Sequence, residues 1–162
     1  MKNGKALTVL LAPALVLAVV LAMGCAEGGG GEDGTITVTV KNLPLDGTPP
    51  NDYDVYGTAV KFDTEDPQAE ENRIAVAAEE NYTTTTVTFV LEEKDASGDP
   101  SGVQKVFSGG SSPIVFIFVD LDDSQSPESP EMASIAVRDV DGDITIVKDY
   151  ATDFKDVEQF GY

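Results

Sequence analysis

Hydrophobic and polar residues alternate along much of the chain, which is the pattern of β-strands buried on one face. In Thr35–Lys41, Ile36, Val38 and Val40 share one face, and threonines and a lysine occupy the other. The same period of two recurs in segments separated by loops rich in Gly, Pro, Ser and Asp. These segments are Tyr53–Phe62, Arg73–Glu79, Thr83–Glu92, Val103–Phe107, Ala133–Asp139 and Ile144–Lys148. The pattern therefore predicts a protein built mainly of strands.

One further strand is apolar without interruption. Ile114–Val119 contains six apolar residues in a row, most of them β-branched or aromatic, which predicts a central strand covered on both faces. Two segments are ambiguous. Arg73–Glu79 fits a strand better than a helical turn, and Tyr150–Tyr162 fits either a last strand or a docked irregular segment.

Seven or eight strands with turn signals between them, and no amphipathic helix, predict an all-β fold for residues 35–162. The expected architecture is an antiparallel β-sandwich, immunoglobulin-like or related. Val103–Phe107 is expected to return beside Thr83–Glu92 as its hairpin partner. Asp141-Gly142 predicts a second tight hairpin, between the last two alternating segments.

The first 24 residues form a separate unit. Lys2 and Lys5 are followed by an almost wholly apolar run, Ala6–Ala22, and then by small residues. A basic segment, an apolar core and a small-residue cleavage zone are the layout of a secretory signal peptide, which we expect to be helical. The apolar run is shorter than the about 20 residues of a membrane-spanning helix, and Pro13 interrupts it. The alternatives are ordinary secretion and a retained membrane helix.

The end of this leader resembles that of the bacterial lipoproteins, whose lipobox reads Leu, a small residue, Gly or Ala, and then Cys. The matching positions are Ala22, Met23, Gly24 and Cys25, with Leu21 one place before the usual leucine. The resemblance implies a diacylglyceryl thioether on Cys25, removal of the leader, and acylation of the new amino terminus in many bacteria. Two or more acyl chains anchor a protein stably.

Residues 25–34 comprise the lipidated cysteine and a Gly-rich segment that we expect to be a flexible linker. Nine such residues span about 17 Å on average, which keeps the domain close to the membrane. The same resemblance implies that an aspartate directly after the cysteine favours inner-membrane retention in some Gram-negative bacteria. Here that position is Ala26. The expected location is the cell envelope: the outer membrane of a cell with two membranes, or the outer face of the plasma membrane of a cell with one.

Charge narrows the range of partners. The chain has 29 acidic and ten basic residues and a net charge of −19, and the leader holds two of the basic residues and no acid. The mature chain therefore carries −21. Such a charge argues against nucleic acid and against adsorption on anionic lipid, and it favours solubility and interaction with cations.

The residue types of most catalytic sites are missing. The chain has no His and a single Cys, Cys25, which the resemblance to lipoproteins assigns to lipid attachment. Ser-His and Cys-His schemes and internal disulfides are therefore excluded. A carboxylate pair could catalyse glycoside hydrolysis, but the chain has so many acidic residues that the sequence singles out no catalytic pair. We expect a non-enzymatic protein with no catalytic residue and no resident cofactor, and a carboxylate-based hydrolase is the last alternative.

Two acidic clusters invite comparison with Ca²⁺ sites. The segment 139–143 (DVDGD) begins like a calcium loop, but Ile144 stands at position six and Tyr150 at position twelve, where an EF-hand needs Gly and Glu. We therefore assign this segment as a turn.

The second cluster, Asp120, Asp122 and Asp123, directly follows the central strand. Carboxylates at a strand end can bind Ca²⁺ when neighbouring loops add oxygens. The alternative is a charged strand end that terminates pairing and keeps the loop solvated. No residue is assigned as a metal ligand on this evidence.

The order of strands suggests one further expectation. If successive strands simply alternate in direction, the acidic loops near residues 63–72, 93–102 and 122–131 lie at the same end as the linker. The membrane-proximal end would then be the more acidic one.

These features predict a lipid-anchored bacterial envelope protein that acts in surface interaction or envelope structure. Its membrane contact is the lipid on Cys25, and an extracytoplasmic protein or glycan is the expected kind of partner. The alternative is a Ca²⁺-dependent module that binds glycan or protein through its acidic loops.

Overall fold

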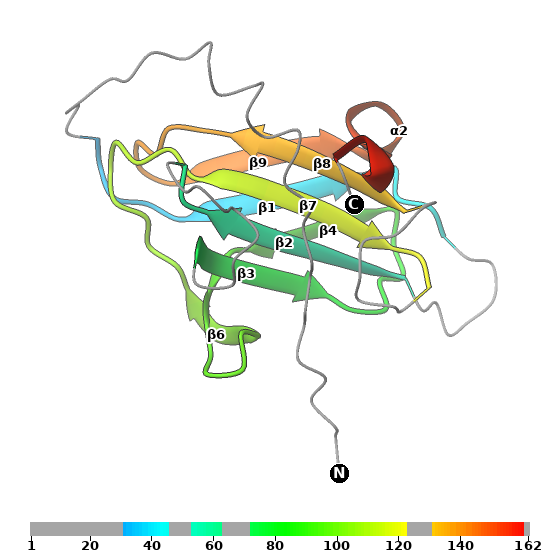
Figure 1. Cartoon of the computed structure of the whole chain (residues 1–162), viewed down its shortest axis with the longest axis horizontal. Helices are drawn as coiled ribbons and strands as arrows, with labels where there is room; N and C mark the ends of the chain where they lie inside the picture. Colours follow the sequence, from blue (N-terminus) through cyan, green and yellow to red (C-terminus); the bar gives the residue numbers. More distant parts are fainter. Residues whose placement is uncertain (1–30, 46–52, 63–71, 123–130, 161–162) are drawn as a thin grey trace.

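The computed structural model describes residues 31–45, 53–62, 72–122 and 131–160, which form two packed β-sheets (Figure 1). A seven-stranded antiparallel sheet packs against a three-stranded sheet. The predicted all-β sandwich is therefore confirmed, with ten strands in the described part of the chain in place of seven or eight. The two short strands β5 and β10 account for most of the difference.

The large sheet has the order β10-β8-β7-β2-β3-β5-β6. Its strands are β2 (Asp54–Val60), β3 (Arg73–Glu79), β5 (Glu92–Lys94), β6 (Pro100–Gln104), β7 (Ile114–Asp120), β8 (Met132–Val137) and β10 (Lys155–Asp156). The prediction of β3 as a strand and of β7 as an internal strand is confirmed.

The small sheet has the order β4-β1-β9. It consists of β1 (Ile36–Lys41), β4 (Thr86–Val90) and β9 (Ile144–Asp149). β4 runs antiparallel to β1, whereas β9 runs parallel to it, so the expectation of purely antiparallel pairing is wrong for one pair. The tail folds into α2 (Tyr150–Asp153), β10 and the 3₁₀ helix η2 (Val157–Phe160).

The main hydrophobic core lies between the two sheets. Ile36, Val38 and Val40 of β1 are fully buried, as the alternation predicts. They belong to the same cluster as Val115 and Ile117 of β7. At Gly57 of β2, a Cβ atom would lie 2.6 Å from the Phe89 ring, so any side chain at this position would have to displace that ring.

One predicted strand is divided between the two sheets. Thr83–Glu92 was expected to be continuous, but β4 belongs to the small sheet and β5 to the large one. Leu91 lies at the crossing point. Its N–H donates to Ile36 of β1 (3.0 Å), and its carbonyl accepts from Lys105 (2.9 Å). The backbone of one buried leucine therefore joins the two layers.

The predicted hairpin at Asp141-Gly142 is wrong. β8 lies in the large sheet and β9 in the small one, and the two strands do not pair. The turn instead carries the chain from one layer to the other, which lets β9 align parallel to β1. Gly142 has a φ of 72°, in the region that favours glycine.

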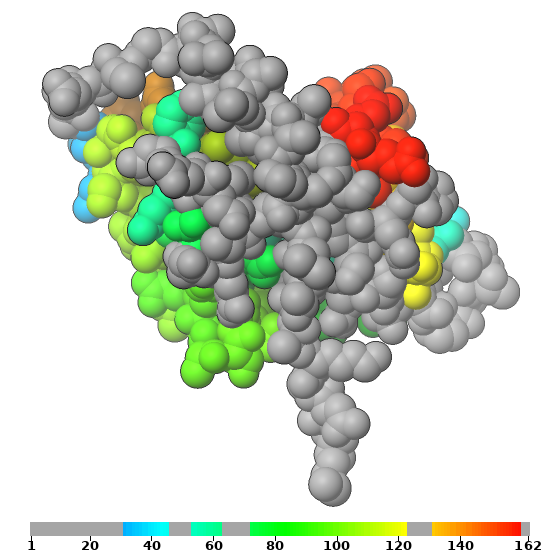
Figure 2. Space-filling view, viewed as in Figure 1, coloured from blue at the N-terminus to red at the C-terminus, as the bar shows by residue number. Residues whose placement is uncertain are grey.

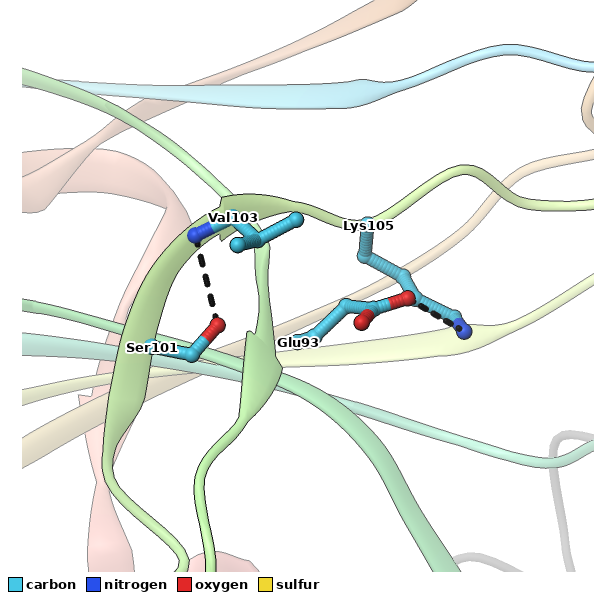
Figure 3. Close-up of polar contacts among 4 residues, drawn as sticks. All are labelled: Glu93, Ser101, Val103 and Lys105. Carbon is cyan, nitrogen blue, oxygen red and sulfur yellow. Dashed lines mark hydrogen bonds and ion pairs between the residues drawn. The ribbon is translucent and has the colours of Figure 1, made fainter.

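The β5–β6 hairpin projects from one edge of the large sheet (Figures 1 and 2). Its outer strand bears features that discourage edge-to-edge pairing: Pro100, and Gly102 with a φ of 79°. The N–H of Val103 donates to Ser101 Oγ at 3.2 Å, and Lys105 pairs with Glu93 at 3.5 Å (Figure 3). Both contacts are exposed, so the ion pair contributes little to stability.

The start of the folded chain is fixed at one end of the sandwich, which we call the tethered end. Gly34 forms a bridge with Phe107, through hydrogen bonds of 3.1 and 2.9 Å. The Glu32 carbonyl accepts from Gly142 (2.8 Å), and Asp33 Oδ1 accepts from Gly109 (2.8 Å). Residues 32–34, assigned to the linker from the sequence, are thus hydrogen-bonded to the domain.

Candidate functional site

Three carboxylates gather where β7 ends, at the opposite end of the sandwich, which we call the free end. Asp120 is the last residue of β7, Asp122 lies two residues later, and Glu131 directly precedes β8. Each offers a carboxylate oxygen within 4.8 Å of the others. The apolar sequence of β7 ends at Asp120, and β8 returns beside β7, which brings Glu131 back to the same place.

Two of these three side chains are buried. Asp120 is 0% exposed and Glu131 is 2% exposed, whereas Asp122 is exposed. Asp120 Oδ1 accepts from the Asp122 N–H at 3.0 Å, and Glu131 Oε1 accepts from the Leu121 N–H at 2.9 Å. The two buried carboxylates therefore hold the first turn of the β7–β8 loop against the sheet.

A fourth carboxylate, Asp54, is the first residue of β2 and stands opposite Asp120 in the antiparallel register. It is 3% exposed. Its Oδ1 accepts from the Asn81 N–H (2.7 Å), and its Oδ2 accepts from the Tyr56 hydroxyl (2.8 Å). Burial, followed by the hydrogen bond to Asp54, raises the pKa of Tyr56 well above its ordinary value.

The donor set suits a hard cation. Carboxylate oxygens are the ligands that Ca²⁺ prefers, and Ca²⁺ takes six to eight of them at about 2.3–2.6 Å. Asp120, Asp122 and Glu131 supply three, so water, main-chain carbonyls or further acids would have to supply the rest. Carboxylates this close repel one another, and a cation between them would remove that repulsion.

The structure brings together part of the cluster expected from the sequence. Asp120 and Asp122 meet as expected, and Asp123 lies outside the described residues. Sequence reasoning missed Asp54 and Glu131. A signal for Asp54 was available, because it shares a face with Tyr56 and Val60 of a mostly apolar strand.

The acids of segment 139–143 do not assemble into a metal site in the described structure; each accepts a hydrogen bond. Asp139 accepts from Ser112 Oγ (2.6 Å), and Asp141 accepts from the Glu32 N–H (3.2 Å). Asp143 Oδ1 accepts from both the N–H and the Oγ1 of Thr35 (2.8 and 2.9 Å). These bonds lower the pKa of Asp143, and they bind the turn to the start of the folded chain.

The expectation that the acidic loops share the linker's end is wrong. Val60, where β2 ends, pairs with Ile114, where β7 begins, while Asp54 pairs with Asp120 at the other end. The β2–β3 and β7–β8 connections therefore leave the sheet at opposite ends. Val140 donates to Ser111, just before β7, and Gly142 donates to Glu32, so the start of β7 lies at the tethered end. The carboxylate cluster follows the other end of β7 and therefore lies at the free end.

The predicted lipidation residue, Cys25, lies outside the described residues. Among those described, no helix has the length and apolarity needed to cross a bilayer. No protein-family model, curated protein or solved structure matches the chain.

Proposed function

We propose that the protein is a lipid-anchored bacterial envelope protein without enzymatic activity, held by a diacylglyceryl thioether on Cys25. The main structural support is the fixed position of the chain's entry into the domain. Residues 32–34 are hydrogen-bonded at the tethered end, and Gly31 lies close to the backbone of Val140 and Gly110. Five residues then remain between Cys25 and Gly31. Five Gly-rich residues span about 12 Å on average.

This short tether would orient the domain relative to the membrane. The tethered end would lie next to the membrane, and the free end, with Asp120, Asp122 and Glu131, would point away from it. Of the two ends of the domain, the free end would be the more accessible to a partner that approaches from outside the membrane. The proposed role is therefore surface interaction or envelope structure, in the outer membrane of a diderm cell or on the outer face of a monoderm plasma membrane.

The anchor can be tested by mass spectrometry and cell fractionation. The amino-terminal peptide of the mature protein should begin at Cys25 and carry the mass of its acyl groups. Cys25→Ser should abolish that mass. Recovery of an unmodified Cys25 peptide from the wild-type protein would refute lipid anchoring.

A second candidate function is Ca²⁺-dependent binding of a glycan or protein at the free end. It is favoured by the meeting of Asp120, Asp122 and Glu131 within 4.8 Å, with two of the three side chains buried. A ligand that binds the native state raises its stability, by about 2.7 kcal/mol at a concentration 100 times its dissociation constant.

Thermal unfolding with CaCl₂ and with EDTA tests this candidate. Calcium should raise the Tm of the wild-type protein, and Asp120→Asn should abolish the rise. Asp139→Asn is the matched control, because it removes a carboxylate at the tethered end and should leave the response unchanged. An equal Tm in CaCl₂ and EDTA for the wild-type protein would rule out the calcium function.

A further inference from the structure

β8 is an edge strand of the large sheet along much of its length. On one side it pairs with β7 at all six of its residues. On the other side, β10 pairs with only two of them, Met132 and Ala133. Within the described chain, residues 134–137 therefore have no strand neighbour on this side. Main-chain groups at such an edge can pair with a strand of another molecule.

The sequence of β8 makes strand addition at this edge a hazard. Met132–Val137 reads MASIAV, with no charged residue, no Pro and no Gly. Uncharged segments of about six residues that favour extended backbone and lack Pro are typical of cross-β assembly. A stable monomer therefore needs something that closes the edge of β8.

The tail of the chain closes the first part of this edge. Ala133 pairs with Lys155 of β10, and the Glu131 carbonyl accepts from the Val157 N–H at 3.0 Å. Alternate residues of an antiparallel strand direct their main-chain groups to the same side. The residues two and four places beyond Ala133 therefore face the same edge, past the end of the pairing with the tail.

Two cationic side chains close the rest. The Ile135 carbonyl accepts from Lys148 Nζ at 2.9 Å, and the Val137 carbonyl accepts from Arg138 Nη1 at 3.0 Å. Lys148 belongs to β9, so its side chain reaches from the small sheet to the large one where the two strands lie side by side (Figure 1). Hydrogen bonds from charged donors are stronger than those between neutral groups. An added strand would have to displace both cations.

Lys148 points inward from its strand. It shares a face of β9 with Ile144 and Ile146, which pack in the main core, and it is partly buried. Burial lowers the pKa of Lys148; Asp153 opposes this effect, and the nearby Arg138 adds to it. An inward-pointing charge on an edge strand is one of the devices by which natural sheets prevent edge-to-edge pairing.

We propose that Lys148 and Arg138 close the edge of β8 to strand addition and so keep the protein monomeric. The strand that they exclude is β8 of a second copy, because identical uncharged strands pair readily. Anchoring of many copies in one membrane would raise their effective concentration and make this protection more important. The role of the two cations does not depend on whether Cys25 carries lipid.

Analytical ultracentrifugation of the chain without its leader (residues 25–162, with Cys25→Ser) tests this role. The double variant Lys148→Met, Arg138→Met removes both donors but keeps apolar stems of similar length. The measurement is made at about 1 M NaCl, where the Debye length is about 3 Å and repulsion between acidic copies is screened. With increasing concentration, the average mass of the double variant should rise towards twice the monomer mass, whereas the wild type should remain monomeric.

The matched control is the double variant Lys41→Met, Lys61→Met. It makes the same change of charge at two exposed positions that belong to neither β8 nor β9, and it should remain monomeric. Lys148→Arg, which keeps a cation on β9, should also remain monomeric. Amide hydrogen exchange followed by NMR locates the contact: the N–H groups of Ile135 and Val137 should become protected as the Lys148→Met, Arg138→Met variant associates.

Three results would overturn the proposal: a Lys148→Met, Arg138→Met variant that stays monomeric, a control that associates equally, or association without protection of Ile135 and Val137. Association of the wild type through β8 would also overturn it. If the double variant does not fold, as judged by circular dichroism, Arg138→Met alone is measured, because this side chain is exposed. That variant should associate with protection of Val137, and a monomer would count against the proposal.

Discussion

Substitution of Gly34 by alanine tests whether the end of the linker is part of the fold. A Cβ on Gly34 would overlap the carbonyl group of Gly142. The obstacle is backbone, which cannot rotate away as a flexible side chain can. The start of β1 and the turn before β9 would have to separate.

The expected cost follows from the hydrogen bonds at this contact. Gly34 exchanges two backbone bonds with Phe107 (3.1 and 2.9 Å), and Glu32 accepts one from Gly142 (2.8 Å). Each such bond contributes about 0.5–1.5 kcal/mol net, and overpacking typically costs about 1–3 kcal/mol. If the separation breaks two of the bonds, the two costs together should lower the free energy of unfolding of Gly34→Ala by about 2–6 kcal/mol.

Urea unfolding of the mature protein, followed by circular dichroism, measures this change. Gly102→Ala is the matched control, because nothing lies within 4 Å of its added Cβ and only the positive φ of 79° opposes alanine. That strain costs about 1–2 kcal/mol. A Gly34→Ala variant no less stable than the wild type would show that residues 31–34 are merely a tether.

Three further results are expected. The Tm should rise when NaCl is increased from about 0.01 M to 1 M. Over this range the Debye length falls from about 30 to 3 Å, so salt screens the self-repulsion of a chain with a net charge of −19. A Tm that falls with salt would contradict this expectation. Hydrogen bonds from Thr35 lower the pKa of Asp143. Their contribution to stability is therefore present above about pH 4 and is lost as the pH falls through the lowered pKa. Asp143→Asn should weaken this acid dependence when urea unfolding is measured as a function of pH. Ile117→Ala, at a fully buried position, should cost about 2–5 kcal/mol in the same assay, whereas Val147→Ala should change stability by less than about 0.5 kcal/mol.

Much of the fold could be predicted from local pattern. The alternation in Thr35–Lys41 corresponds to β1 with its buried Ile36, Val38 and Val40. The uninterrupted apolar run corresponds to β7, which is buried at all seven positions. These predictions succeed because burial on one or both faces of a sheet directly selects the residue types along a strand.

The assignment of strands to sheets could not be predicted in the same way. The pattern of Thr83–Glu92 carries no sign that the chain changes sheets at Leu91, because β4 and β5 continue the same extended backbone. Asp141-Gly142 has the composition of a hairpin turn, yet it joins strands of different layers. A turn sequence determines the local path of the chain but not the partner of the strand that follows.

Only part of the carboxylate cluster could be predicted from the sequence. Asp120 and Asp122 follow the apolar strand in the sequence, and their proximity needs no knowledge of the fold. Asp54 and Glu131 join them through the pairing of β2 and β8 with β7. The same pairing places the β2–β3 and β7–β8 connections at opposite ends and overturns the expectation of a single acidic end.

The sequence by itself determined the positions of most strands, the acidic charge and the lack of histidine, because each depends on residue type and local order alone. The leader with its lipobox is a prediction from the same kind of local pattern. The tertiary structure decided which strands share a sheet, which acids meet at the free end, and that Gly31 and Gly34 pack against the turn before β9. These features depend on contacts between residues far apart in the chain, which no local pattern encodes.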